Sequence, residues 1–248
     1  MARPRHLEHD PITEALIDIH VEPRPNLSFT ELQDGFRALD FGYYLKNSIS
    51  EGTFAFALSP DGQHQSAAGA AQIGVRMHSQ DEKFVAQCRL GGFTLSRLPP
   101  YETWPNLIQE TKRLWSIYNE RLAPVRVTRV ATRFINNLRL PLEQGTSFQV
   151  YLNKFADVPD EAPQLLSSFF QRFELVDPQN RASVNLTLVL ESNQASSPAP
   201  VILDVDAFSV TNLVAGDEEI WATLERLRVL KNQCFFGAIT ERAAELYK

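Results

Sequence analysis

Apolar and polar residues follow two different periods in the first part of the chain. Residues 14–23, EALIDIHVEP, alternate at every second position and end at a proline, which predicts a strand with one solvated face. Residues 29–40 place apolar side chains at helical spacing, after a Ser28 that can cap a helix together with Glu31. We expect the next β-rich runs, separated by turn residues, to form an antiparallel meander. These runs are residues 43–49, 53–59, 70–79 and 83–98.

A long amphipathic helix is predicted over residues 101–122, because its apolar side chains share one stripe. Pro105 fits this helix only in the first turn. A second series of elements begins after Pro124 and ends with a helix over residues 216–239, whose acidic start suits the positive end of a helix dipole. Between them we predict strands at 125–140, 165–177, 182–192 and 201–213 and a short helix at 147–153, and after them a last helical turn at 240–248.

The first and second series of predicted elements end with similar sequences. Residues 93–98, FTLSRL, resemble residues 208–213, FSVTNL, and each run leads through a turn into a Trp-x-x-Leu. We interpret this echo as an internal duplication of a β-α-β(3-4)-α unit, while any two strand-to-helix corners could produce the same likeness. The predicted fold class is α+β, with antiparallel sheets each packed by one long helix. This element order resembles that of the TATA-binding protein and of helix-grip folds.

The same pattern divides the chain into three parts. Residues 1–10 are expected to be a flexible tail, residues 11–123 a first α+β repeat, and residues 124–248 a second. Only RLAPVR joins the repeats, without a Gly- or Ser-rich linker, so we expect one fused globular unit that shares a sheet or a core.

Composition narrows the classes of function. The 248 residues carry a net charge of −6 and have a pI near 5.4, which argues against nucleic-acid binding except through a local basic patch. Cys88 and Cys234 both lie in apolar sequence, so reduced thiols and a cytoplasmic location are expected. The chain has no apolar run of the length that a signal peptide or a membrane helix needs, and no membrane partner is expected.

Two acids and two arginines are the most suggestive charged residues. Asp204 and Asp206 are two residues apart on a predicted strand and therefore share a face, where they could hold a cation or share a proton. Arg129 and Arg133 share a face of another strand and could bind phosphate or carboxylate. We prefer a structural interpretation, in which these arginines pair with Asp204, Asp206 or Asp18 across the sheet.

Nothing in the sequence marks a catalytic centre. It contains no nucleophile elbow and no Gly-rich phosphate loop, and Gly91-Gly92 is interpreted as a bulge or bend within a strand. His6-x-x-His9 has metal-ligand residue types but is better explained as part of a solvated tail. We therefore predict no catalytic residue, no metal and no cofactor. Arg97 and Tyr101 become candidate binding residues because the echo at 208–221 does not reproduce them.

Four segments in order resemble a sporadically distributed, uncharacterised bacterial protein family of about this length. They are Pro11-Ile-Thr-Glu-Ala-Leu16, the run from Ser96 to Trp104, Arg133-Phe-Ile-Asn136 and Leu203-Asp-Val-Asp206. The resemblance spans nearly the whole chain and adds Asn136 to the candidate residues. It implies a class of role, that of mobile accessory genes in phage defence or toxin–antitoxin systems, and no reaction.

The preferred functional hypothesis is a non-enzymatic, protein-binding or regulatory subunit of such a bacterial accessory system. The alternative is a protein that binds a small anionic or amphipathic ligand in a pocket between sheet and helix. That pocket is expected to be lined by Phe54, Phe56, Trp104 and Trp115, with Arg133 holding the anionic group. Nucleic-acid binding through the sheet face and a cryptic metal-dependent hydrolase built on Asp204 and Asp206 are further alternatives.

Overall fold

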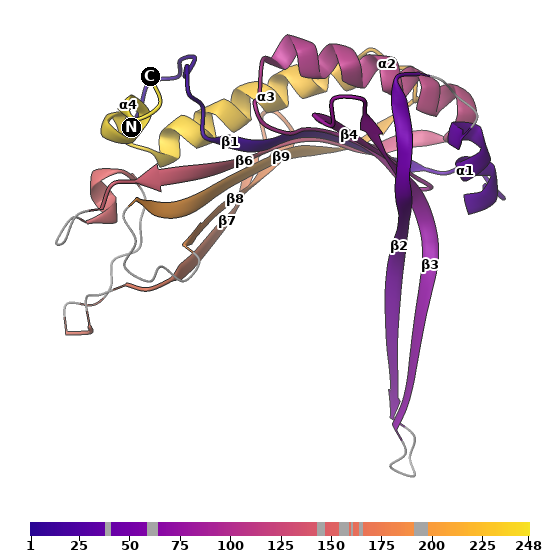
Figure 1. Cartoon of the computed structure of the whole chain (residues 1–248), viewed down its shortest axis with the longest axis horizontal. Coiled ribbons are helices and arrows are strands. Elements are labelled where there is room, and N and C mark those ends of the chain that lie inside the picture. Colours follow the sequence, from indigo (N-terminus) through magenta and orange to yellow (C-terminus); the bar gives the residue numbers. More distant parts are fainter. Residues whose placement is uncertain are drawn as a thin grey trace.

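The described residues form a nine-stranded antiparallel sheet with helices on one of its faces (Figure 1). This computed structural model describes residues 1–37, 41–58, 64–142, 147–153, 159, 161–163, 166–190 and 198–248, with the backbone alone for 53–58 and 64–69. The strands are β1 (Ile12–Glu22), β2 (Tyr43–Leu58), β3 (His64–Ser79), β4 (Phe84–Arg89), β5 (Gly92–Arg97), β6 (Arg126–Leu140), β7 (Phe169–Asp177), β8 (Ala182–Leu190) and β9 (Ala199–Leu213). The helices are α1 (Phe29–Arg37), α2 (Trp104–Leu122), the 3-10 turn η1 (Phe148–Val150), α3 (Glu219–Ala238) and α4 (Glu241–Glu245).

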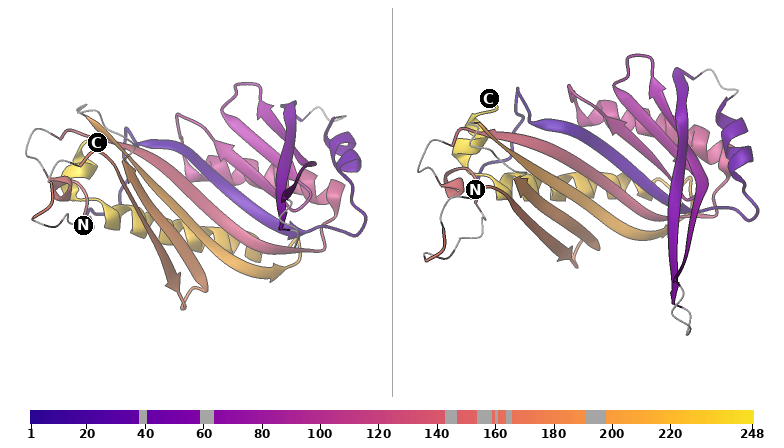
Figure 2. Two further views of the ribbon diagram at one scale, coloured as in Figure 1. Left: turned by 90° about the horizontal axis from the view of Figure 1, so that it is seen from below. Right: turned by 60° about the horizontal axis from the view of Figure 1, so that its bottom comes forward.

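The strand order is β2-β3-β4-β5-β1-β6-β9-β8-β7, and at its centre β1 pairs from Ile12 to Glu22 with β6. The sheets expected for the two halves are therefore one continuous sheet. Helices α2 and α3 lie on one face, and the sheet arches away from them (Figures 1 and 2). We call the opposite surface the hollow face. No described helix covers it.

Strand β1 shows how the sequence builds these two faces. Ala15, Ile17 and Ile19 are fully buried on the side of the helices, whereas the alternating Asp18 and His20 lie on the hollow face. The predicted half-solvated strand is confirmed, because a period of two directs successive side chains to opposite faces of a sheet.

Local signals at the helix ends are also confirmed. Pro105 lies in the first turn of α2, as expected. The structure adds a cap that was not predicted there, because the side chain of Thr103 accepts a hydrogen bond from the backbone N–H of Asn106. The Ser28 hydroxyl accepts from the N–H of Glu31 at the start of α1, as expected for a capping box. In the described part of the chain, none of the helices combines the length and the apolar composition needed to cross a membrane.

The meander contains four strands, as many as the sequence predicts, but their boundaries differ, because two predicted runs join into β2 and the run 83–98 divides into β4 and β5. Residues 43–49 and 53–59 were expected as separate strands, but β2 runs through Glu51-Gly52 without a break and pairs with β3 into a long hairpin that projects from the body of the molecule (Figure 1). Gly52 stays in register opposite Ala70, so the ladder of the partner strand overrides the local turn signal. The Pro60-Asp-Gly turn signal lies outside the described residues.

Gly91 and Gly92 do not form a bulge within one strand. Leu90 and Gly91 are the turn between β4 and β5, and Gly92 begins β5 opposite His20 of β1. A Cβ atom on Gly92 would lie 2.8 Å from the carbonyl oxygen of Ile19, whereas one on Gly91 would meet nothing within 4 Å. Gly92 is therefore required by the close approach of β1.

The echo between residues 93–98 and 208–213 aligns residues of opposite faces. Phe93 packs beneath α2, with its ring centroid 5.8 Å from that of Tyr118. Phe208 lies on the hollow face, where the guanidinium of Arg129 covers its ring at 4.5 Å. The sequence similarity between residues 93–98 and 208–213 therefore does not support a duplication.

The N-terminal segment has a packed position, although a flexible tail was expected there. Ala2 and Leu7 are buried, and the N–H of Ala2 donates to the carbonyl oxygens of Phe236 and Ile239 at 3.2 and 3.0 Å. The segment consequently forms one wall of the cavity described below.

Candidate functional site

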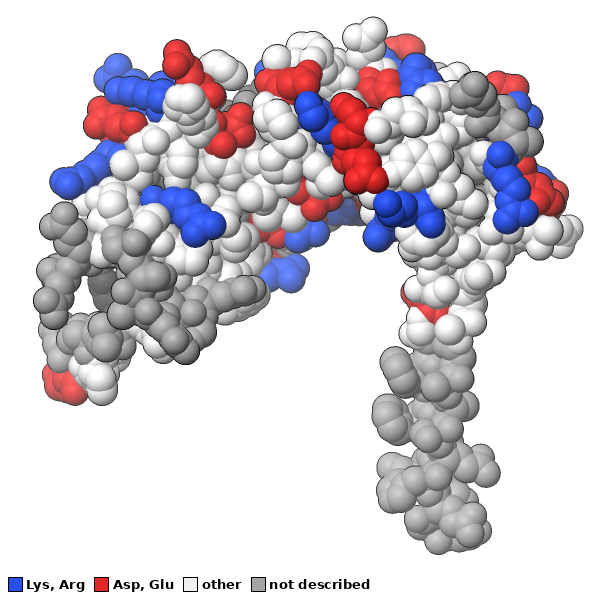
Figure 3. Space-filling view, in the orientation of Figure 1, with Lys and Arg blue, Asp and Glu red and all other residues white. Residues whose placement is uncertain are grey.

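Acidic and basic side chains lie beside each other on the hollow face (Figure 3). Asp18 contacts Arg89 at 2.6 Å and Arg129 at 3.0 Å, and Arg129 reaches Asp206 at 3.1 Å. Arg133 pairs with Asp204 at 2.6 Å on the same strands, β6 and β9. The cross-sheet ion-pair ladder preferred from the sequence is confirmed.

The charged form of the Asp18 carboxylate is strongly stabilised in this ladder. Burial alone would raise its pKa, but hydrogen bonds from His20 and Thr94 and the positive charges of His20 and Arg89 outweigh burial and lower the pKa to about 2. The side chains of Asp204 and Asp206 are occupied by their arginines. Among the described residues, no group of three or more His, Cys, Asp or Glu side chains could hold a metal ion.

A cavity of about 530 Å³ lies on the other side of the sheet. Its walls come from the N-terminal segment, the corner between β5 and α2, strand β6 and helix α3. Tyr101, Trp104, Phe134 and Phe235 are among the aromatic residues that line it. Three of the four segments that carry the family resemblance meet here, through Pro11, Tyr101 with Trp104, and Phe134 with Asn136.

Lys231 of α3 is the buried cation of this cavity. Its Nζ lies 3.5 Å from the centroid of the Phe134 ring, and within the described part of the chain it makes no ion pair or hydrogen bond. Burial disfavours its charged form and, with a smaller effect of the Arg228 charge, lowers its pKa to about 7, although Asp10 opposes this. The amine therefore changes its protonation near neutral pH.

Two further polar groups face the same cavity. The ring of Tyr101 meets Phe134 edge to face at a centroid distance of 5.4 Å, and burial raises the pKa of its hydroxyl. Burial also raises the pKa of Asp10, whose Oδ1 accepts a hydrogen bond from the N–H of Ile12. Arg228 sits at the rim with its guanidinium 5.6 Å from the Trp104 ring. The cavity thus combines apolar walls with a few convergent polar groups.

The structure separates the seven residues singled out from the sequence. Arg129, Arg133, Asp204 and Asp206 lie on the hollow face, whereas Tyr101 and Asn136 line the cavity. Asn136 is buried, and its Nδ2 donates to the carbonyl oxygens of Phe134 and Leu203. Arg97 is buried beside the Phe84 ring and pairs with Glu102 at 2.6 Å, which anchors the corner that carries Tyr101.

The residues that line the cavity differ from those predicted from the sequence. Trp104 does line the cavity, but Trp115 projects from α2 toward Phe93 of the sheet, and its indole N–H donates to the carbonyl of Ala215. Arg133 lies on the opposite face of the sheet and is already paired. The side chains of Phe54 and Phe56 lie outside the described residues. Lys231 takes the place that the sequence analysis assigned to Arg133.

A signal for Lys231 exists in the sequence. The buried stripe of α3 runs Ile220, Leu224, Leu227, Lys231, Phe235, so the lysine occupies a position where helical spacing calls for an apolar residue. A charged residue in the apolar stripe of an otherwise regular helix could have been singled out for that reason.

No protein-family model matches the chain, and no curated protein matches its sequence at a significant level. The resemblance to an accessory-gene family consequently stays a prediction.

Proposed function

We propose that this protein binds a small organic anion with an apolar body in the cavity between β6 and α3. Lys231 carries the proposal, because it is a buried amine in a mainly apolar wall without an ion pair in the described part of the chain. A buried ammonium group without a partner costs several kcal/mol, and an anion would remove that cost.

The dimensions of the cavity support a ligand of this kind. A volume of about 530 Å³ lies within the range of roughly 300–1,000 Å³ that is typical of small-molecule sites. The amine lies over the ring of Phe134, which the ring of Tyr101 meets edge to face, so an aliphatic or aromatic body would pack beside the charged group. Asp10 and the Tyr101 hydroxyl are placed to hydrogen-bond a second polar atom.

Isothermal titration calorimetry tests the proposal with decanoate, 2-naphthoate and phenyl phosphate as probes. We expect one probe or more to bind the wild type in one-to-one stoichiometry, and Lys231→Gln to bind it at least about tenfold more weakly, as for a lost charge-assisted contact. Lys112→Gln makes the same change at an exposed lysine on α2 and should keep wild-type affinity. Failure of all three probes, or equal affinity of Lys231→Gln and the wild type, would contradict the proposal.

Proton uptake gives a second, independent readout. The pKa of Lys231 is about 7, so at about pH 8 most molecules carry a neutral amine. A bound anion would favour the ammonium form, and the amine would then take up a proton from the buffer. Titrations in two buffers that differ in ionisation enthalpy should therefore differ in apparent binding enthalpy. This difference should disappear in Lys231→Gln.

Protein binding is the second candidate function, as a regulatory subunit of a bacterial accessory system. The arch between the projecting β2–β3 hairpin and the opposite end of the sheet supports it by offering a concave surface (Figure 1). The free thiols of Cys88 and Cys234 support the expected cytoplasmic location. A partner recovered from the native host in stoichiometric amount, and lost with Arg133→Glu on the hollow face, would favour this function. Nucleic-acid binding is less supported, because the arginines of this face are neutralised by Asp18, Asp204 and Asp206.

We also propose that the two halves derive from a duplicated β-α-β(3-4)-α unit of the kind found in the TATA-binding-protein or helix-grip order. The strand order supports this, because β1 and β6 are neighbours at the centre and are flanked by β5 and β9. Each of these flanking strands precedes a long helix.

A further inference from the structure

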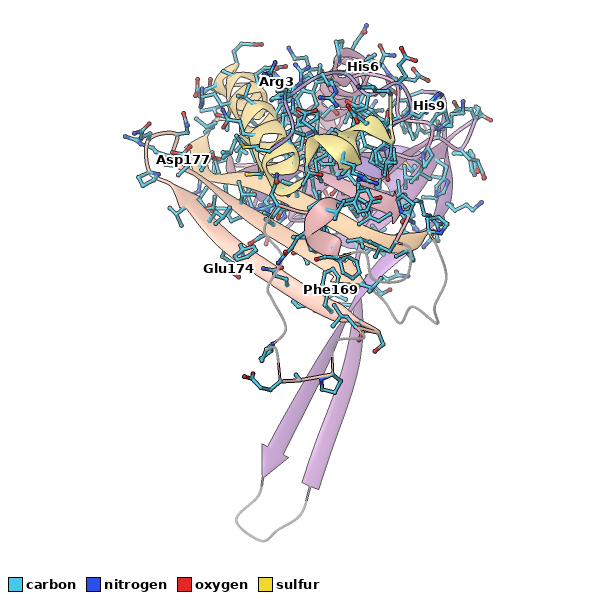
Figure 4. All side chains as sticks on the ribbon, turned by 90° about the vertical axis from the view of Figure 1, so that its left-hand side faces the viewer. Arg3, His6, His9, Phe169, Glu174 and Asp177 are labelled. Carbon is cyan, nitrogen blue, oxygen red and sulfur yellow. The ribbon has the colours of Figure 1, made fainter. Side chains whose placement is uncertain are left out.

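Strand β7 is an outer edge of the sheet, and no described strand pairs with its second side (Figure 4). Its even-numbered residues lie on the hollow face, since Glu174 is opposite Asn185, whose amide contacts Asp206. Phe170 and Val176 on that face are 69% and 75% exposed. A long edge strand with exposed apolar side chains is a template for pairing with another strand.

The sequence of β7, FFQRFELVD, suits pairing with itself. The strand has nine residues, so its midpoint is Phe173. In an antiparallel pair centred there, all residues of the strand are matched, and Arg172 lies opposite Glu174 of the second copy. Phe170 lies opposite the second copy's Val176 in the same register. Opposite charges and apolar pairs directly across two strands are the stabilising combinations.

Neighbouring registers lose this match. In an antiparallel pair, residues directly opposite each other point to the same face of the sheet. If both copies keep their hollow faces on the same side, the pair can therefore be centred on a residue but not between two residues, and the register shifts by moving that centre by whole residues. Centring the pair on Arg172 places two arginines opposite each other, and centring it on Glu174 places two glutamates together. The register with full overlap is thus also the one with complementary charges.

The charges already form half of the required arrangement within one chain. Arg172 contacts Glu174 at 3.1 Å, and both side chains are solvent-exposed. A second copy would complete a ring of four alternating charges across the two-fold axis.

We propose that β7 pairs antiparallel with β7 of a second copy, in a register centred on Phe173, and joins two molecules into one continuous sheet. The partner is therefore another molecule of this chain. The proposal does not depend on ligand binding in the cavity.

Charge exchange tests the register in the full-length protein. Sedimentation equilibrium from about 1 to about 300 µM should show a monomer–dimer equilibrium for the wild type, as expected for an interface of one strand pair. Arg172→Glu alone and Glu174→Arg alone should each weaken the dimer at least about tenfold, because the two-fold axis creates two like-charged pairs. An equimolar mixture of the two variants should restore the dimer, since each arginine then meets a glutamate.

A matched control is available on α3. Arg226 pairs with Glu219 at 2.7 Å and its side chain is 46% exposed, against 47% for Arg172. Arg226→Glu should keep wild-type self-association. A wild type that stays monomeric throughout, single variants that dimerise as the wild type does, or a mixture that does not recover would each overturn the proposal.

Cysteine cross-linking locates the centre of the pair by a separate route. Residues directly opposite in an antiparallel pair have Cα atoms about 4.5–5.5 Å apart, within the range of a disulfide. In a Cys234→Ser background, Phe173→Cys should form an intermolecular disulfide upon mild oxidation, whereas Gln171→Cys should not. Equal cross-linking at both positions would refute the proposed register.

Discussion

Replacing Lys231 by methionine should stabilise the protein, and by an amount that depends on pH. Methionine keeps the length of the side chain and removes a charge that is buried among Phe134, Tyr101 and Phe235. In the folded wild type the pKa of Lys231 is lowered from 10.5 to about 7, mainly by burial. Lys231→Met should therefore raise the free energy of unfolding by the amount that burying the charged lysine costs the wild type.

The magnitude follows from the linkage between protonation and folding. A change of one in pKa corresponds to about 1.4 kcal/mol, so below pH 7 the buried lysine costs the folded state about 5 kcal/mol. Between pH 7 and pH 10.5 the unfolded chain binds the proton that the folded protein has lost, and the wild type therefore gains stability as the pH rises. The cost is about 2 kcal/mol at pH 9, so the advantage of Lys231→Met should shrink by about 3 kcal/mol between pH 5 and pH 9.

Urea denaturation followed by circular dichroism at pH 5, 7 and 9 measures this difference. Any constant contribution of the methionine side chain cancels, because only the change with pH is used. Lys112→Met, at an exposed position on α2, should follow the wild type at each pH. A free-energy difference between Lys231→Met and the wild type that does not vary with pH would refute the reasoning. Loss of ligand binding together with a gain in stability would show that this lysine is retained for function.

Three further substitutions test the fold around the two faces. Asp18→Asn should destabilise the protein by about 2 kcal/mol at neutral pH, because the pKa of Asp18 is lowered from 3.8 to about 2 in the folded state. Urea denaturation should show that this loss of stability shrinks by about 1 kcal/mol between pH 6 and pH 3. A loss that does not vary with pH would contradict this prediction. Gly92→Ala should lower the free energy of unfolding by about 1–3 kcal/mol, because its Cβ would lie 2.8 Å from a backbone oxygen, whereas Gly91→Ala in the adjacent turn should change it by less than about 0.5 kcal/mol. Thr103→Ala removes the cap of α2 and should cost about 1 kcal/mol, detected as a lower melting temperature; an unchanged melting temperature would show that the cap is replaced by solvent.

The helices and most strands were predictable because their signals are local. Helix α2 follows from an apolar stripe and a proline that only the first turn accepts. The ion pairs of the hollow face were predictable in kind, since arginines and aspartates on alternating positions of buried strands need partners. Which arginine meets which aspartate depends on strand register, and that register was not evident from the sequence.

The errors occur where a distant segment decides the local structure. Glu51-Gly52 reads as a turn, but β3 continues the ladder past it. Gly91-Gly92 reads as a bulge, but the chain reverses at Leu90-Gly91, and the close approach of β1 explains the second glycine. Phe93 and Phe208 match as letters, and only the packing of α2 shows that they face opposite sides.

The sequence by itself determined the α+β class, the two long helices and the alternation that gives the sheet one buried and one charged face, because each depends on residues within a few positions of one another. The tertiary structure decided the continuous sheet, the position of β7 at its edge, where no described strand pairs with the second side, and the cavity around Lys231. Asp10, Tyr101, Phe134 and Lys231 come from four separate segments, and only the packing of α3 on β6 brings them together. The burial of that lysine, and with it the lowered pKa, exists only once those segments exclude water from it.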